Sequence, residues 1–364
     1  MAEAAAAPLP LTPSVPDRSA SSGLDRLLDA PRTSAGARAA EPSPRPVVAV
    51  TGAGGFIGRH LVVALAEAGW LPRLLMRREP DDESWRGLPL QVVAGSLAQP
   101  QALERLVDGA AVVIHAAGLI KAARRAEFYA VNRDGSIALA DAVARVAPLA
   151  QVVHFSTLAA REPLLSDYAG SKRAGEEAMR ERLGARVTVL RPPVVYGPGD
   201  RETLLFFRLA RAWRVPLLGP PEARAALIHV RDLVGLVERL VRAALDGDTT
   251  LVGAVWTAAD ERPAGYRWDE LLGAAARALG RPQPRFVRVP QSLLGALARA
   301  GDAARLAGVA SMLGTQKLRE LRHADWSVTP AERARPAGWR ARYDLDAGFR
   351  DAVAWYRRAG WLPA

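Results

Sequence analysis

The 364-residue sequence has no cysteine and only five histidines. Without cysteine the protein has no disulfide, no thiolate nucleophile and no cysteine-ligated zinc or iron–sulfur site. The histidines show no HExxH or other metal-ligand spacing; they are His60, His115, His154, His229 and His323. We therefore expect no metal site, and any catalysis has to use other groups.

Long apolar runs are also missing. No uncharged apolar stretch reaches the roughly 18 residues that span a bilayer, and the first residues lack the basic start and apolar core of a signal peptide. The chain is 49% hydrophobic and 24% charged, which is typical of one large or two modest globular units. We expect a cytoplasmic protein, with peripheral contact to a membrane surface left open.

The sequence has fewer acidic than basic residues: it contains 38 Asp and Glu and 49 Lys and Arg, so the net charge is +11. A basic protein attracts the phosphates of a nucleotide cofactor, of acidic lipids or of nucleic acid. The arginines are scattered and form no single patch with interleaved aromatics in the sequence, which argues against nucleic-acid binding.

Two regions differ sharply in composition. Residues 1–45 are rich in Ala, Pro and Ser, cannot support a core, and are predicted to be a disordered extension. From Pro46 onward strands alternate with helices, which predicts an α/β, Rossmann-like doubly wound parallel sheet. After a first strand in "PVVAVT", strands are expected over 71–78, 90–95, 111–118, 151–157 and 186–197, and helices over 99–108, about 125–147 and around Tyr168.

Beyond residue 197 the alternation loosens, which predicts a smaller C-terminal substrate lobe. The NAD(P)-binding domain is expected to cover 46–197 plus about 226–258, and the substrate lobe about 198–225 plus 259–364. Within them we expect helices near 202–213, 231–245 and 268–279, a strand near 226–230, and further short elements at "AVWTAAD" and "PRFVRVP". Segment 291–313 is interpreted as an amphipathic core helix or helical pair, with a membrane-contacting or oligomer-forming helix as the alternative.

A glycine cluster, "TGAGGFIG" at 51–58, directly follows the first strand and opens the first helix. In this position Gly52 allows a tight turn, Gly55 lets a pyrophosphate approach the backbone, and Gly58 lets helix and strand pack closely. The helix N-terminus then holds the phosphates, so the motif predicts a dinucleotide site.

The end of the second strand indicates which dinucleotide is bound. An acid there would bond the ribose hydroxyls of NAD, but the sequence places Met76 at this point, followed by Arg77 and Arg78. Two arginines can neutralise a 2′-phosphate, so NADP(H) is favoured over NAD(H). In the alternative interpretation the arginines are merely solvated, and Glu79 or Asp81 contacts the ribose.

Tyr168 and Lys172 lie four residues apart in the helical segment "SDYAGSKRAGE". Residues at this spacing share one helix face, so the phenol and the ammonium can converge on one ligand. Taken alone, such a pair is typical of an ordinary solvated helix surface.

Together these features resemble the extended short-chain dehydrogenase/reductases, the NAD(P)-dependent epimerase/dehydratase family. The resemblance covers about residues 46–364. It depends on "TGAGGFIG" at 51–58, "HAAG" at 115–118, "VNRDGS" at 131–136, "FST" at 155–157, the YxxxK pair at 168–172, "RPPVVYGPGD" at 191–200 and "IHVRDL" at 228–233.

The resemblance implies a catalytic role for five residues. Tyr168 would exchange a proton with a substrate oxygen, while Lys172 lowers the pKa of the phenol and holds the nicotinamide ribose. Thr157 would bond the same oxygen, with Ser156 as the second candidate, and Asn132 would support the lysine. Alternatively, Thr157 caps a loop and Asn132 a helix.

The resemblance also implies cofactor contacts and partners. Dimers formed through helices near 125–147 and 168–182 are common in the family, so a homodimer is expected. The implied cofactor-binding residues are Gly52, Gly55, Phe56, Ile57, Gly58, Arg77, Arg78, Ala116, Ala117, Gly118, Tyr168, Lys172, Pro193 and Val195.

Two departures from the family pattern bear on the substrate. Ser96 replaces an acid that often contacts adenine, and "LGPPEARAALIHV" lacks the stretch with which nucleotide-sugar enzymes bind a nucleotide diphosphate. The leading hypothesis is therefore a reductase or dehydrogenase acting on a lipid-like secondary alcohol or ketone, such as a 3-keto sphingolipid, sterol or hopanoid intermediate. The alternatives are a nucleotide-sugar epimerase or dehydratase and a non-catalytic nucleotide-binding subunit of a membrane complex.

Overall fold

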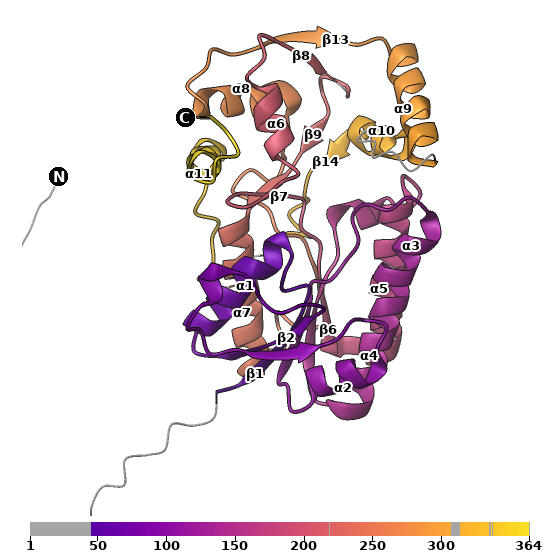
Figure 1. Ribbon diagram of the computed structural model, residues 1–364, viewed down its shortest axis with the longest axis vertical. Coiled ribbons are helices and arrows are strands. Elements are labelled where there is room, and N and C mark those ends of the chain that lie inside the picture. Colours follow the sequence, from indigo (N-terminus) through magenta and orange to yellow (C-terminus); the bar gives the residue numbers. More distant parts are fainter. Residues whose placement is uncertain (1–44, 218, 307–313, 335, 337, 364) are drawn as a thin grey trace, which may run out of the picture. The chain divides into compact units, whose positions relative to one another are not determined.

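The computed structural model describes residues 45–363 except 218, 307–313, 335 and 337. Arg45–Ala364 forms one compact unit (Figure 1). The predicted disordered extension over 1–45 lies outside the described residues except for Arg45, and so does the end of segment 291–313.

A seven-stranded sheet forms the centre of this unit, and every neighbouring pair of its strands is parallel. Its spatial order is β11 (Val255–Trp256), β6 (Val187–Leu190), β5 (Gln151–Phe155), β4 (Val112–His115), β1 (Val47–Thr51), β2 (Leu71–Met76) and β3 (Gln91–Ala94). The order reverses between β1 and β4, and in open parallel sheets a ligand binds at the carboxyl ends of the strands at such a point.

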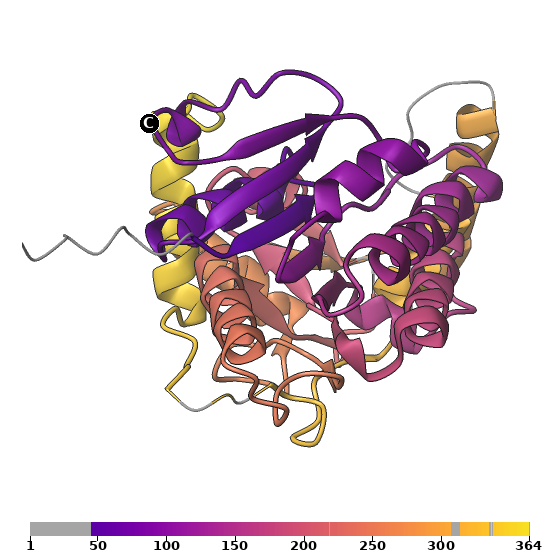
Figure 2. The same ribbon diagram turned by 90° about the horizontal axis from the view of Figure 1, so that it is seen from below.

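Helices cover both faces of the sheet (Figure 2). On one face lie α1 (Phe56–Glu67) and α7 (Val230–Leu245), and on the other lie α2 (Pro100–Val107), α4 (Gly135–Val146) and α5 (Asp167–Leu183). Along β1, Val48 and Val50 pack under the first layer while Ala49 packs under the second. Because both faces are buried, the strands are continuously apolar, and the predicted doubly wound α/β fold is confirmed.

Three predicted elements differ from the structure. The expected strand over 186–197 is two strands, β6 and β7 (Val194–Tyr196), because Pro192 and Pro193 have no N–H to donate to a ladder. The expected helix over 125–147 comprises α3 (Arg125–Tyr129), a π-helical turn over Ala130–Asp134, and α4. The helix expected near 202–213 is only α6 (Leu204–Leu209).

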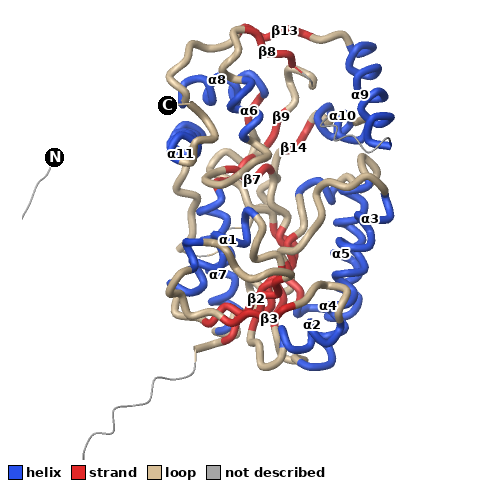
Figure 3. Tube along the Cα trace, in the orientation of Figure 1, coloured by secondary structure: helices blue, strands red, loops and turns tan. Residues whose placement is uncertain are grey.

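The C-terminal half adds three small sheets and further helices (Figure 3). Strand β10 (Leu227–His229) pairs with β7 rather than with the central sheet, whereas β11 joins the central sheet beside β6. The remaining elements are β8 (Arg214–Leu217) paired with β13 (Arg285–Arg288), β9 (Arg224–Ala225) between β12 (Tyr266–Arg267) and β14 (Asp325–Trp326), and helices α8 (Trp268–Ala278), α9 (Gln291–Leu306), α10 (Thr315–Arg322) and α11 (Leu345–Arg358). Among the described helices, none is long and apolar enough to cross a membrane.

Candidate active site

The glycine cluster forms a tight turn between β1 and α1. Gly52 has φ +76°, and a Cβ there would lie 2.5 Å from the backbone carbon of Ala116. A Cβ at Gly58 would lie 2.1 Å from the Gly52 carbonyl oxygen, so only glycine permits this packing of helix against strand. Gly55 caps α1 in an extended conformation. The N–H groups of the first helical turn, beginning at Phe56 and Ile57, have no intrahelical acceptor and can bind an anion.

The two arginines expected to select the cofactor are solvent-exposed just beyond the carboxyl end of β2. Arg77 and Arg78 follow Met76, whose Cε lies 3.8 Å from where a Cβ on Gly54 would stand. The arginines thus lie at the same sheet edge as the glycine turn. Glu79 and Asp81 are exposed as well, so the geometry keeps both sequence interpretations open.

A buried hydrogen-bond chain fixes the segment after β4. Thr51 Oγ1 lies 2.7 Å from His115 Nδ1 and accepts from the Ala117 N–H at 3.3 Å, while His115 Nε2 lies 3.1 Å from Ser136 Oγ. Burial, with a contribution from the Lys172 charge, lowers the pKa of His115 to about 3, so the ring is neutral. Sequence reasoning noted His115 only as part of "HAAG"; the structure gives it a role in positioning Ala116, Ala117 and the strand end.

Lys172 is buried beneath the carboxyl end of β5. Its Nζ donates to the Phe155 carbonyl oxygen at 2.5 Å. Burial lowers the pKa of Lys172 to about 8, against the opposing effect of the Glu176 carboxylate. A Cβ on Gly118 would stand 3.5 Å from Lys172 Nζ and 3.3 Å from Asn132 Oδ1, so glycine at this position lets both polar groups reach the end of β4.

Tyr168 lies in the first turn of α5 beside Thr157. Burial raises the pKa of Tyr168 to about 12, a hydrogen bond with the Thr157 side chain lowers it, and the Glu320 charge raises it. The Lys172 ammonium donates to the Phe155 carbonyl oxygen, and its expected effect on the pKa of Tyr168 stays a prediction. Thr157 also caps the short helix that follows β5, accepting from the Ala159 N–H at 3.3 Å.

Ser156 has a different partner from its neighbour. Its hydroxyl donates to Glu176, whose carboxylate also accepts from Arg191 Nε at 2.8 Å and Nη2 at 2.5 Å. This ion pair is nearly buried, with 13% of the Arg191 side chain and 4% of the Glu176 side chain exposed. The structure therefore brings Thr157, and not Ser156, to Tyr168, while Ser156 belongs to a buried ionic group that sequence reasoning missed.

Asn132 lies in the π-helical turn and is 1% exposed. Its side chain accepts from the Leu119 N–H at 2.7 Å and donates to the Leu119 carbonyl oxygen at 3.0 Å and to Ser171 Oγ at 2.9 Å. Ser171 Oγ in turn donates to the Tyr168 carbonyl oxygen at 2.8 Å. Asn132 thus ties the segment after β4 to the helix that holds Tyr168 and Lys172.

The remaining predicted cofactor residues lie along the same edge of the sheet. The Leu158 N–H donates to the Pro192 carbonyl oxygen at 2.9 Å, which places the Thr157 loop beside the start of "PVVYG". Pro193 and Val195 in this segment are partly buried. Among the residues that the structure describes, no group of three or more His, Cys, Asp or Glu side chains is placed to hold a metal ion.

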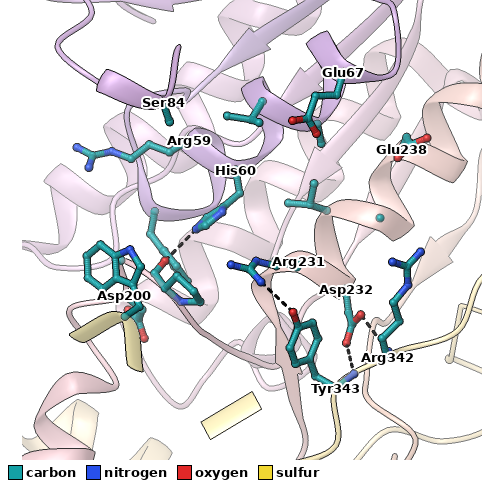
Figure 4. A pocket seen from close by; sticks show the side chains of 18 of the residues that line it. Arg59, His60, Glu67, Ser84, Asp200, Arg231, Asp232, Glu238, Arg342 and Tyr343 are labelled. Carbon is teal, nitrogen blue, oxygen red and sulfur yellow. Dashed lines mark hydrogen bonds between the residues drawn. The ribbon is translucent and has the colours of Figure 1, made fainter. Parts of the chain in front are cut away.

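A cavity of about 1300 Å³ lies between α1, α7 and the chain near α11 (Figure 4). His60 Nε2 lies 2.9 Å from the Pro198 carbonyl oxygen, and Arg231 Nη1 donates to the Tyr343 hydroxyl at 2.9 Å. The cavity reaches the glycine turn at Gly54 and Phe56, but neither Tyr168 nor Lys172 lines it. Its charges balance, because six arginines and six carboxylates line it: Arg59, Arg201, Arg231, Arg239, Arg340 and Arg342 against Glu67, Asp82, Asp200, Glu202, Asp232 and Glu238.

Comparison with known proteins agrees with this geometry. The sequence profile of the NAD dependent epimerase/dehydratase family matches residues 48–253. Ceramide reductase from Caulobacter vibrioides is 46% identical over 321 residues, covering 88% of this chain and 97% of that protein. That match is longer than the profile match, so it includes residues outside 48–253.

Two further proteins resemble the chain over most of its length. Sterol demethylase protein B from Methylococcus capsulatus is 26% identical over 350 residues, covering 86% of this chain and 99% of that protein. The solved structure of MoeE5 in complex with UDP-glucuronic acid and NAD matches with a TM-score of 0.63 at 22% identity, covering 86% of this chain and 99% of that one. The structural match is a likeness of fold.

Proposed function

The chain belongs to the NAD-dependent epimerase/dehydratase family and is an NAD(P)-dependent enzyme of the extended short-chain dehydrogenase/reductase type; from that premise we propose that it reduces the ketone of a 3-keto sphingolipid to the secondary alcohol. The similarity to ceramide reductase supports the substrate class, because it covers more of the chain than the family profile does. A ceramide has a secondary hydroxyl group next to its amide-bearing carbon, and the corresponding ketone is a substrate of the kind that a Tyr–Lys reductase reduces.

One observation supports the direction of this reaction. Burial and the Glu320 charge keep the pKa of Tyr168 near 12, so the phenol is protonated at neutral pH. A protonated phenol is a proton donor, which reduction of a carbonyl requires and oxidation of an alcohol does not. The burial of Tyr168 thus supports reduction as the working direction.

Each residue of the site has its own role in the proposed reduction. A reduced nicotinamide, when bound, would supply the hydride for the carbonyl carbon. Tyr168 donates its hydroxyl proton to the carbonyl oxygen as the C=O π bond breaks, and the phenolate then regains a proton from solvent. Thr157 donates a hydrogen bond to the same oxygen and stabilises the charge that develops there. Lys172 orients the cofactor ribose, and its own position is set by the Phe155 carbonyl oxygen.

Reduction with NADPH is the favoured cofactor chemistry. Arg77 and Arg78 are exposed at the carboxyl end of β2, where each can pair with a 2′-phosphate. The dinucleotide itself would bind along the N–H groups at the start of α1. A homodimer formed through α4 and α5 stays a prediction.

The decisive experiment is single-turnover reduction of a short-chain 3-keto ceramide in mixed micelles by the full-length protein. NADPH deuterated on the transferred position should give an alcohol that contains one deuterium at C3, detected by mass spectrometry. Tyr168→Phe, which removes only the hydroxyl, should lower the rate by about 10²–10⁴-fold while NADPH binding persists. Interconversion of UDP-sugars without reduction of the ketone would instead establish the epimerase alternative.

A further inference from the structure

Exposed arginines surround an exposed tryptophan on the β8–β13 pair. We call this surface the Trp213 face; it consists of Arg211, Trp213, Arg214, Arg285, Val287 and Arg288, all of them exposed. β8 and β13 lie at the end of the compact unit away from the central sheet (Figure 1). The proposed reaction uses none of these residues.

Strand register explains why three of these side chains share one side. β8 and β13 are parallel, with Arg285 opposite Arg214 and Val287 opposite Pro216. The alternate residues Val215 and Phe286 pack into the core of the C-terminal half. Because successive side chains in a strand point to opposite sides, Arg214, Arg285 and Val287 face solvent together.

Trp213 is 61% exposed, which is unusual for so large an apolar side chain. The Arg214 guanidinium carbon lies 4.8 Å from the centroid of its ring, and that of Arg285 lies 4.9 Å away. An exposed indole between two guanidinium groups combines an apolar body with positive charge. Trp is enriched at the interface between bilayer and water, and Arg is attracted to anionic lipid headgroups there.

The charge of this surface has one sign only. Residues 203–221 and 271–301, which contain β8 and β13, include eight arginines and no Asp or Glu. Within the described part of the chain, the four arginines of the Trp213 face form no ion pair with an acidic side chain. Such a surface attracts anionic lipid, and each arginine near an anionic bilayer contributes roughly a fivefold gain in affinity.

The next helix extends the apolar part of the surface. α9 begins at Gln291, three residues after β13 ends, and its Leu293 and Leu297 are 51% and 50% exposed. Spaced by four residues, they share one side of the helix, whereas Leu294 and Ala298 pack on Leu318. Sequence analysis left this segment open between core and membrane contact; the described part has one buried side and one exposed leucine side.

We infer that the Trp213 face and the exposed leucines of α9 dock the protein on an anionic phospholipid bilayer. The arginines complement the lipid phosphates, and Trp213, Val287 and the two leucines enter the headgroup region. Nucleic acid offers phosphates as well, but it would leave the exposed aliphatic side chains in water. The inference goes beyond the proposed function, and vesicle binding tests it without any catalytic turnover.

The experiment is co-sedimentation of the full-length protein with phosphatidylcholine vesicles that contain or lack phosphatidylglycerol, at about 0.1 M salt. Binding should require the anionic lipid and weaken as salt rises. Arg214→Glu with Arg285→Glu should lower the affinity at least about tenfold, and Trp213→Ala should lower it severalfold. The matched control, Arg105→Glu with Arg180→Glu, changes two exposed arginines on α2 and α5 and should leave the affinity within about twofold.

Retained NADPH binding reports that each variant is folded. If the double reversal does not fold, Arg214→Gln with Arg285→Gln serves in its place with the same expected direction. The inference is overturned if the wild type does not bind anionic vesicles, or if the variant with Arg214→Glu and Arg285→Glu binds them as tightly as the wild type. Equal loss of binding in the control variant would overturn it as well. Duplex DNA held more tightly than vesicles through Arg214 and Arg285 would also overturn it and identify a nucleic-acid surface.

Discussion

The Asp167 N–H donates to Gln316 Oε1 at 2.8 Å, and Gln316 Nε2 donates back to Asp167 Oδ2 at 2.7 Å. This reciprocal pair fastens α10 to the first turn of α5, next to Tyr168. Ser166, which caps α5 by accepting from the Ala169 N–H at 3.0 Å, donates its hydroxyl to Glu320 of α10. A helix distant in sequence thereby sets the charge around the proposed proton donor.

Glu320→Gln should shift the alkaline limb of the reduction profile. The Glu320 carboxylate raises the pKa of Tyr168, so its removal lowers that pKa. Activity that needs a protonated phenol is lost as the pH rises through this pKa; the wild type has a value of about 12, and the variant should begin to decline at a lower pH than the wild type. Stopped-flow rates from pH 8 to 12 measure this, with Glu181→Gln on α5, the helix of Tyr168, as control. Identical profiles for all three proteins would contradict a role for Glu320.

Substitutions of the neighbouring Thr157 and Ser156 should have different effects on kcat. Thr157→Val removes the hydroxyl beside Tyr168 while preserving shape, so kcat should fall by about 10²–10³-fold. The lost cap of the short helix after β5 should cost about 1 kcal/mol of unfolding free energy. Ser156→Ala leaves the Glu176 carboxylate without one donor, which should cost about 1–3 kcal/mol of unfolding free energy and little kcat. Steady-state kinetics and urea denaturation on both variants make the comparison, and the reverse pattern would transfer the catalytic hydroxyl to Ser156.

Glu176→Gln should be among the most destabilising single changes in the protein. It leaves the nearly buried Arg191 without its counterion, and breaking such a pair costs roughly 3–5 kcal/mol. The neighbouring Glu177→Gln is the matched control, because the Glu177 side chain is 55% exposed and pairs with the partly exposed Arg173. Urea midpoints measure the difference, and equal midpoints for the two variants would refute the assigned role of the ion pair.

Arg77→Ala combined with Arg78→Ala should weaken NADPH binding by about 10–100-fold and leave NADH binding nearly unchanged, because only NADPH has the 2′-phosphate. Nicotinamide fluorescence titrations report both affinities. Arg86→Ala, which changes an exposed arginine farther along the same connection, is the control. A wild type that prefers NADH, or a variant that loses both cofactors alike, would favour the interpretation with Glu79 or Asp81.

Gly175→Ala should destabilise the protein by about 1–3 kcal/mol through overpacking. A Cβ at Gly175 would lie 2.3 Å from the Asn132 carbonyl oxygen, so α5 has to shift from the π-helical turn. Gly295→Ala is the comparison, since its Cβ would meet only the flexible end of Arg299 at 3.7 Å and alanine favours the helix. Thermal unfolding of both variants decides the point; a stabilised Gly175→Ala protein would show that the close approach is not needed.

The sequence alone determined the features that depend on neighbours along the chain. The glycine spacing at Gly52, Gly55 and Gly58 dictated the turn between β1 and α1, because the required backbone angles and clearances are local. Alternation of apolar strands with helices dictated a doubly wound parallel sheet, and the four-residue spacing placed Tyr168 and Lys172 on one helix face. Family motifs added the expectation of a nicotinamide-dependent enzyme, which the family profile confirmed.

Only the tertiary structure decided the relationships between distant segments. The Gln316 and Glu320 contacts with the start of α5, the pairing of Glu176 with Ser156 and Arg191, and the meeting of Arg214 with Arg285 around Trp213 all join residues that no local pattern links. Burial and the charge of Glu320 likewise raise the pKa of Tyr168, and the spacing of residues along the chain specifies neither effect. These quantities depend on which surfaces exclude water and which charges remain close after folding, and the linear order of residues does not specify either.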